Sequence, residues 1–126
     1  MKFSKLKELN VWNESMKLAA EIYKTVNTSS KLTRDFGLKE QIQRSAVSIP
    51  SNIAEGFERE TNAEFIRFLY IAKGSCAELK TQIILAKEIS YIIESKSEEL
   101  IETCDHISVM IYRLIEYLKK NRLQKK

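Results

Sequence analysis

Gln41-Ile-Gln-Arg-Ser-Ala-Val-Ser-Ile-Pro-Ser-Asn-Ile-Ala-Glu-Gly56 is the stretch that decides the fold. In and around it, apolar residues recur every three or four positions, at Leu38, Ile42, Ala46, Ile49, Ile53 and Phe57. This is the spacing of one buried helix face. Pro50 lies inside the pattern, where it lacks an amide donor and presses on the carbonyl four residues earlier. Because the apolar spacing keeps its phase across the proline, the sequence predicts one kinked helix.

Similar patterns outside this stretch predict three more helices. The four helices are expected at about residues 11–28, 34–57, 62–90 and 96–121. Asn10 is a candidate cap of the first, and two S/T-x-x-E capping boxes, Thr61–Glu64 and Ser95–Glu98, mark the starts of the last two. With three glycines and one proline, the chain has too few turn residues for a sandwich, a barrel or a doubly wound sheet. We therefore predict an all-α, antiparallel up-down-up-down four-helix bundle, formed as a single domain over residues 1–126.

A stripe of small polar and charged residues runs beside the apolar face of the second predicted helix. Its members are Ser45, Ser48, Asn52, Glu55 and Arg59. Residues one turn apart could line a catalytic groove, but a Glu–Arg pair at this spacing is more often an exposed ion pair. We predict no catalytic residue and interpret Ser48, Asn52 and Glu55 as a contact with a second subunit or another protein.

The last two predicted helices carry residues that predict contacts with a second subunit or with a neighbouring helix. Val109, Met110, Ile115 and Tyr117 lie off the expected inward stripe, which consists of Leu100 or Ile101, Cys104, Ile107, Ile111, Leu114 and Leu118. One bundle does not need so many apolar residues, so we predict an oligomer contact that includes Val109, Met110 and Tyr117. On the third helix, Gly74 lies in a patch of small residues and predicts the close approach of a neighbouring helix, near Trp12 or the proline kink.

The charge of the chain is concentrated at its C-terminal end. The net charge is +4, and five positive residues lie among the last eight: Lys119, Lys120, Arg122, Lys125 and Lys126. The rest of the chain then carries 16 Lys and Arg against 17 Asp and Glu. Such a basic tail can attract phosphate backbones. The alternative is a solvated end that offsets the negative end of the last helix dipole.

The sequence offers few residues for chemistry. His106 is the only histidine and has no second soft ligand nearby, so no metal site or cofactor is expected. Cys76 and Cys104 are expected about 9 Å apart along the bundle and are interpreted as reduced core residues. No apolar run approaches the ~18 residues of a membrane span, and the first residues do not resemble a signal peptide. A cytoplasmic location is the expectation.

Several stretches resemble a known family. They are the Gln41–Gly56 stretch itself, Leu9-Asn-Val-Trp12, Ile22-Tyr23, Phe36-Gly-Leu38, Glu64-Phe65, Phe68-Leu69 and Ala72-Lys-Gly-Ser75. Together they resemble the bacterial four-helix-bundle family known from open reading frames inside intervening sequences of 23S ribosomal RNA genes, over about residues 9–115. Where that family often has a proline before the second helix, this chain has Ser29-Ser-Lys31.

The resemblance implies a left-handed bundle that assembles into a ring, typically of five subunits, and it implies no catalytic residues. The chain is also more distantly similar to the accessory variability proteins of diversity-generating retroelements, pentameric barrels thought to hold nucleic acid and a reverse transcriptase. A shared fold does not by itself establish a shared function.

From these observations we expect a non-enzymatic, ring-forming scaffold that binds structured RNA or another nucleic acid. The candidate contacts are the basic residues Arg34, Lys39, Arg44, Arg59, Arg67, Lys119, Lys120 and Arg122. The alternative is a self-assembly or protein-binding module with no nucleic-acid role. The near-neutral charge of the chain without its tail favours this alternative.

Overall fold

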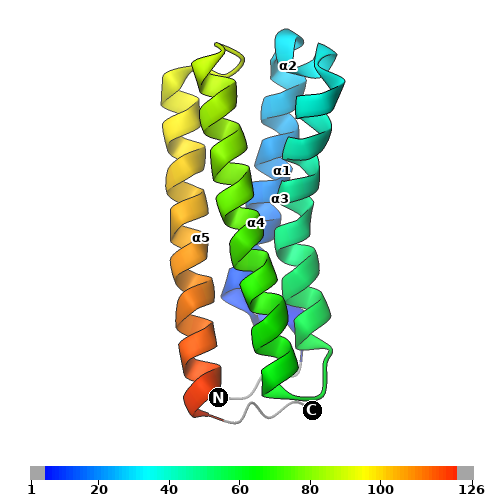
Figure 1. Cartoon of the computed structure of the whole chain (residues 1–126), viewed down its shortest axis with the longest axis vertical. Helices are drawn as coiled ribbons and strands as arrows, with labels where there is room; N and C mark the ends of the chain where they lie inside the picture. The colour runs from blue at the N-terminus through cyan, green and yellow to red at the C-terminus, as the bar shows by residue number, and fades with distance from the viewer. Residues whose placement is uncertain (1–4, 122–126) are drawn as a thin grey trace.

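The computed structural model describes residues 5–121 and consists of four long helices that lie side by side (Figure 1). They are α1 (Asn10–Thr28), α3 (Phe36–Phe57), α4 (Asn62–Glu88) and α5 (Glu94–Lys120). A 3-10 turn, η1 (Leu6–Glu8), precedes α1, and the five-residue α2 (Ser30–Arg34) connects α1 to α3. The predicted four-helix bundle is confirmed.

The order of the helices around the bundle is α1, α3, α4 and α5. α3 packs most extensively against α4, α4 packs against α5, and α1 packs against α3 and less extensively against α5. α1 therefore lies diagonally across from α4. We call the end with the α3–α4 turn the lower end. The upper end holds α2 and the α4–α5 turn (Figure 1).

The stretch around Pro50 forms one helix, as predicted. α3 runs through Pro50 without interruption, and the apolar face expected of it is buried except for the half-buried Leu38. Near its end, α3 comes very close to α4 at Gly56, where an added Cβ would lie 2.7 Å from Phe68 Cβ. The prediction that Gly74 provides a close approach is wrong for the helices of this chain, because α4 turns Gly74 outward and nothing among residues 5–121 lies within 4 Å of a Cβ built there.

The start of α4 follows the predicted local chemistry, and the start of α1 does not. Thr61 Oγ1 accepts a hydrogen bond from the Glu64 amide at 3.2 Å and caps α4. Asn10 is the first residue of α1 rather than its cap, and Leu9 precedes it without a side-chain hydrogen bond. Asn13 instead donates its side-chain amide to the Leu9 carbonyl at 3.2 Å.

The start of α5 was also predicted incorrectly. α5 begins at Glu94, so the Ser95–Glu98 box lies inside the helix. The cause lies at the end of α4, where Ser90 takes a left-handed conformation with φ 65° and the Tyr91 amide donates to the Ala86 carbonyl at 2.7 Å. This C-terminal motif turns the chain at once. After the buried Ile92, the single residue Ile93 leads into α5.

The short helix α2 was not predicted. Ser29 Oγ accepts from the Leu32 amide at 3.1 Å and donates to the Tyr91 carbonyl at 2.8 Å. Leu32 is fully buried at the upper end. Asp35 caps the next helix, α3, where its Oδ1 accepts a hydrogen bond from the Leu38 amide at 3.1 Å. α2 is thus held by its cap, by one buried leucine and by a bond to the α4–α5 turn.

The inward stripe of α5 differs from the prediction by one residue. Ile115 is fully buried, whereas Leu114 is half-buried. Ile115 therefore belongs to the core of this chain and not to a second surface. Val109 remains exposed, and Met110 and Tyr117 are half-buried against the core.

A half-buried ion pair joins α1 to α5. Lys96 Nζ bonds to Glu21 on α1 and to Glu99 on α5. The pKa of Glu21 is lowered, chiefly by the hydrogen bond from Lys96 and by its charge. The pKa of Lys96 is raised, chiefly by its hydrogen bonds to Glu21 and Glu99. Both groups are charged, and the pair stabilises the fold, only at pH values above the folded-state pKa of Glu21 and below that of Lys96.

Replacing Lys96 with methionine is expected to make the stability of the protein fall less as the pH is lowered. Because the pKa of Glu21 is lowered from its ordinary value of 4.5, the contribution of the pair is present above that pH and lost as the pH falls through the folded value. The test is the melting temperature of both proteins from pH 7 to about pH 3. Lys17→Met, which removes an exposed pair within α1, is the control. An unchanged acid slope in Lys96→Met would contradict this prediction.

Candidate nucleic-acid interface

The structure separates the predicted basic residues into two groups. Arg59, Arg67, Lys119 and Lys120 lie at the lower end, on the α3–α4 turn, α4 and α5. Arg34, Lys39 and Arg44 lie on α2 and the upper half of α3. Arg122 lies outside the described residues, together with the rest of the basic tail.

Two arginines at the lower end share one aromatic ring. The guanidinium carbons of Arg59 and Arg67 lie 4.8 and 4.5 Å from the centroid of the half-buried Phe68 ring. Arg59 also bonds to Glu55 at 2.9 Å, and Arg67 lies 3.6 Å from Glu64. The ring orients both cations, and the two exposed carboxylates offset part of their charge.

A second basic–aromatic pair lies where α5 meets α4. Lys119 Nζ lies 5.9 Å from the centroid of the Tyr70 ring and 3.3 Å from Glu116 Oε2. The pKa of Lys119 is raised from its ordinary value, chiefly by its hydrogen bonds with Tyr70 and Glu116. Lys120 beside it is exposed.

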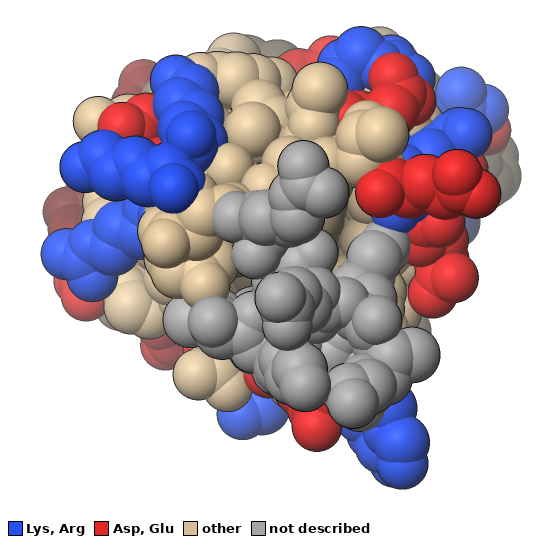
Figure 2. Space-filling view, turned by 90° about the horizontal axis from the view of Figure 1, so that it is seen from below, with Lys and Arg blue, Asp and Glu red and all other residues tan. Residues whose placement is uncertain are grey.

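Asn62 fixes the relative position of these groups. Its side-chain amide donates to the carbonyls of Leu118 and Asn121 at 3.0 and 2.7 Å, which joins the start of α4 to the end of α5. Figure 2 views this end of the molecule. Lys and Arg side chains gather on one side of it, and on the opposite side they alternate with Asp and Glu. The lower end therefore combines fixed cations with aromatic rings and an uneven charge distribution.

The polar stripe of α3 makes hydrogen bonds within the chain. Ser48 Oγ lies 2.8 Å from Ser75 Oγ on α4, and the Asn52 amide donates to the carbonyl and hydroxyl oxygens of Ser48 at 2.8 and 2.9 Å. Ser48 and Asn52 are half-buried, Ser75 is buried, and Glu55 is exposed. The role of Ser48, Asn52 and Glu55 in a contact between subunits stays a prediction. Ser75, the hydrogen-bond partner of Ser48, was missed, because its only signal was a place in a patch of small residues.

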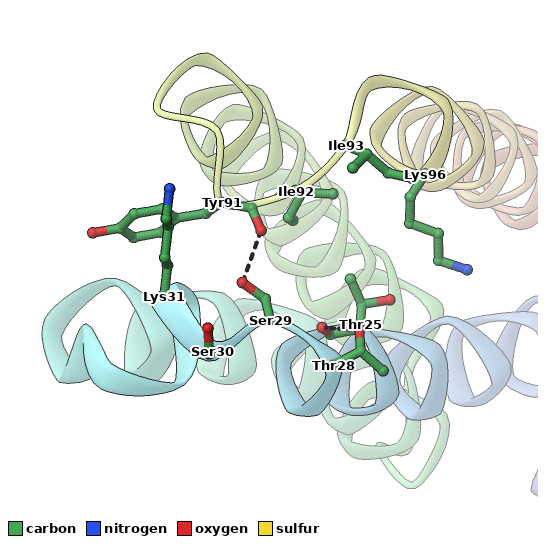
Figure 3. Close-up of a pocket in the computed structure, with 9 residues that line it drawn as sticks. All are labelled: Thr25, Thr28, Ser29, Ser30, Lys31, Tyr91, Ile92, Ile93 and Lys96. Atoms are coloured by element: carbon green, nitrogen blue, oxygen red, sulfur yellow. Dashed lines mark hydrogen bonds between the residues drawn. The ribbon is translucent and has the colours of Figure 1, made fainter.

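A pocket of about 520 Å³ lies at the upper end (Figure 3). Its walls come from the α1–α2 corner and the α4–α5 turn, and the hydrogen bond from Ser29 to the Tyr91 carbonyl crosses between them (Figure 3). Lys96, one of its two lysines, is already paired with Glu21 and Glu99. The Ser29–Tyr91 bond holds the corner to the turn, and the Lys96–Glu21 pair joins α5 to α1 beside the pocket. The polar groups of the pocket thus contribute to the packing of the upper end.

The reactive side chains are either buried or dispersed. Cys76 and Cys104 are buried free thiols, and burial raises the pKa of each to about 12. His106 is exposed and lines a shallow groove with Glu14, Glu98 and other polar residues. Within residues 5–121, no group of three or more His, Cys, Asp and Glu is placed to hold a metal ion. None of the helices in this range is long and apolar enough to cross a membrane.

Comparisons with known proteins agree with the sequence resemblance. The model of the 23S rRNA-intervening sequence protein family matches residues 7–113. Among solved structures, the chain is similar to a protein of unknown function from the S23 ribosomal protein family of Bacteroides thetaiotaomicron. The TM-score is 0.76 at 28% identity, over 83% of this chain and 97% of that chain. A search of curated proteins finds no match. The chain thus belongs to the 23S rRNA-intervening sequence protein family.

Proposed function

We propose that this chain is a non-catalytic cytoplasmic scaffold that assembles with copies of itself into a ring and binds structured RNA through its lower end. The main supporting observation is the arrangement of Arg59 and Arg67 on the ring of Phe68. A ring of five subunits is the expectation that the family resemblance adds.

The chemistry of the lower end suits the RNA backbone. A guanidinium that rests on an aromatic ring keeps N–H groups directed outward, where they can donate to phosphate oxygens. Lys119 and Lys120 add two charges from α5 at the same end. Because Glu55 and Glu64 offset part of the arginine charge, each copy is expected to bind weakly. A ring would present several such sites at once and raise the overall affinity.

Removing the lower-end charges is expected to weaken RNA binding and its salt dependence. The variant replaces Arg59, Lys119 and Lys120 with glutamine and leaves Arg67 in place. We expect its affinity for a labelled structured RNA to fall at least about tenfold at low salt, and the slope of log K against log salt to flatten by up to about three. Fluorescence anisotropy at low and physiological salt measures both quantities.

The matched control removes the same number of charges elsewhere. It replaces Lys31, Arg34 and Lys39, on α2 and the upper half of α3, with glutamine. The last two are basic residues that the sequence also marked as candidates. We expect a small change in this variant. Equal losses in both variants would show a general charge effect, and a native chain that fails to bind at low salt would contradict RNA binding altogether.

Self-assembly without nucleic acid is the second candidate function. It is favoured by an exposed apolar groove between α1 and α3, to which Met16, Tyr23 and Val47 each expose more than 40% of their surface. If the native chain assembles but does not bind RNA, this second function stands.

A further inference from the structure

The groove between α1 and α3 lies on one side of the bundle, and nothing within residues 5–121 covers it. It has a volume of about 440 Å³ and a mainly apolar lining that includes Trp12, Met16, Tyr23, Val47 and Pro50. Ser51 on α3 lines it as well. Exposed apolar grooves of this kind are typical of contacts between proteins.

A second apolar surface lies on the outward side of α4, the helix diagonally across from α1. Tyr70 and Ile71 are 49% and 41% exposed there. Gly74, about one turn further along α4, is exposed as well. A glycine in the middle of a helix costs about 1 kcal/mol relative to alanine. Among the described residues nothing lies within 4 Å of a Cβ built at Gly74, so no contact in this part of the chain explains the glycine. A helix from outside could approach α4 closely at this position.

Each surface carries a charged stripe with the same spacing. On α3, exposed Arg44, Ser51 and Glu55 follow one another at intervals of seven and four residues. Such intervals place residues on one side of a helix, and Ser51 lines the groove. Arg44 and Glu55 are not part of the groove lining, but the spacing places them in line with Ser51, Arg44 toward the upper end and Glu55 toward the lower end.

On α4, exposed Arg67, Gly74 and Glu78 follow one another at the same two intervals. Both stripes run from a positive residue through a small one to a negative one. Because α3 and α4 are antiparallel, the α4 stripe has its positive residue at the lower end and its negative residue at the upper end. Glu78 makes no ion pair within residues 5–121.

The two stripes also lie at matching heights. The Ser48–Ser75 hydrogen bond, at 2.8 Å, fixes the register between α3 and α4. In that register Arg44 lies level with Glu78, and Glu55 lies level with Arg67. Two copies that stand parallel would thus place opposite charges together at both heights. In an inverted copy the like charges would meet instead.

From this match we infer that the outward side of α4 in one copy docks into the α1–α3 groove of a parallel second copy. The inference rests on the self-assembly in the proposed function and names its interface. Tyr70 and Ile71 would cover the groove, with Gly74 opposite Ser51. Three of the four charges already make ion pairs within the chain, Arg44 at 3.9 Å, Arg67 at 3.6 Å and Glu55 at 2.9 Å, but all three pairs are exposed and readily exchanged. Because the two surfaces differ, the contact is heterologous and can close a ring.

Cross-linking tests the pairing of the surfaces. Ser51→Cys and Gly74→Cys each place an exposed thiol at the centre of one surface, and a short bis-maleimide joins thiols that meet. The native thiols of Cys76 and Cys104 are buried and stay unreacted. We expect covalent dimers when the two variants are mixed, a ladder of larger products from the double variant, and little product from either variant alone. Self-linking of a single variant as strong as in the mixture would overturn the heterologous contact.

A charge reversal and its rescue test the orientation. Glu78→Arg places a second cation opposite Arg44 and is expected to weaken association about tenfold. Adding Arg44→Glu restores the opposite charges and is expected to restore association to within about twofold. Analytical ultracentrifugation over a range of concentrations measures both. A native chain that is monomeric throughout would end both the docking and the self-assembly proposals. A native oligomer that tolerates Glu78→Arg would end the docking proposal alone.

Discussion

Replacing Gly56 with alanine is expected to lower the free energy of unfolding by about 3 kcal/mol, although the change adds a single methyl group. The new Cβ would lie 2.7 Å from Phe68 Cβ, 2.9 Å from Phe65 Cδ1 and 3.2 Å from the Phe65 carbonyl oxygen. Two of these three atoms belong to the backbone of α4 or are attached directly to it, so no side-chain rotation removes the overlap. α3 and α4, the two helices that pack most extensively on each other, must therefore separate near the end of α3. Against a typical total stability of about 5–15 kcal/mol, this is a large loss.

The measurement is urea unfolding followed by circular dichroism, at one protein concentration for all variants. Gly37→Ala is the matched control, since it makes the same change in the same helix. Its new Cβ would lie 3.8 Å from Asp35 Oδ1, an ordinary contact. This control is expected to be neutral or to gain up to about 1 kcal/mol. A Gly56→Ala protein with the native unfolding midpoint would show that α3 and α4 do not approach so closely.

Replacing Leu32 with alanine is expected to cost about 3 kcal/mol, the second large effect. Leu32 is the only buried residue of α2 and is fully enclosed at the upper end. Its truncation leaves a cavity, and neighbouring groups cannot easily fill it because the Ser29–Tyr91 hydrogen bond ties the corner to the α4–α5 turn. The same urea experiment measures the change.

Ile93→Ala is the control for Leu32→Ala. Ile93 lies at the same end of the bundle and loses a side chain of similar size, but it is 72% exposed. We expect this control to lose no more than about 0.5 kcal/mol. Equal losses in the two variants would show that α2 is held by its backbone and not by its buried leucine.

The helices were predictable from the sequence because their apolar spacing is a local property. The phase across Pro50 identified one helix, and Thr61 marked the start of α4 because a capping side chain bonds to an amide three residues away. The start of α5 could not be found in this way. It depends on how α4 closes at Ser90 and Tyr91, and the buried position of Ile92 in that turn becomes visible only in the packed bundle.

The candidate interface was predictable only as a set of charges. The sequence identified Arg59 and Arg67, but it did not identify the ring that they share, because Arg59 meets Phe68 only once α3 and α4 have folded back on each other. The packing of α3 against α4 also determines the surroundings of Gly56 and Gly74. Both are helical glycines, and only the position of the neighbouring helix shows that the first is enclosed and the second is open.

The order of the helices around the bundle has a consequence for the speed of folding. α3, α4 and α5 each lie beside the helix that follows or precedes them, so most of their contacts join segments close in the chain. Proteins dominated by such local contacts fold rapidly, in microseconds to milliseconds. The contact of α1 with α5 is different, because it joins the two most distant helices and is the least extensive of the four contacts between long helices. We expect this contact to form last and to open first, so amide protons of α1 should exchange sooner than those of α3 and α4.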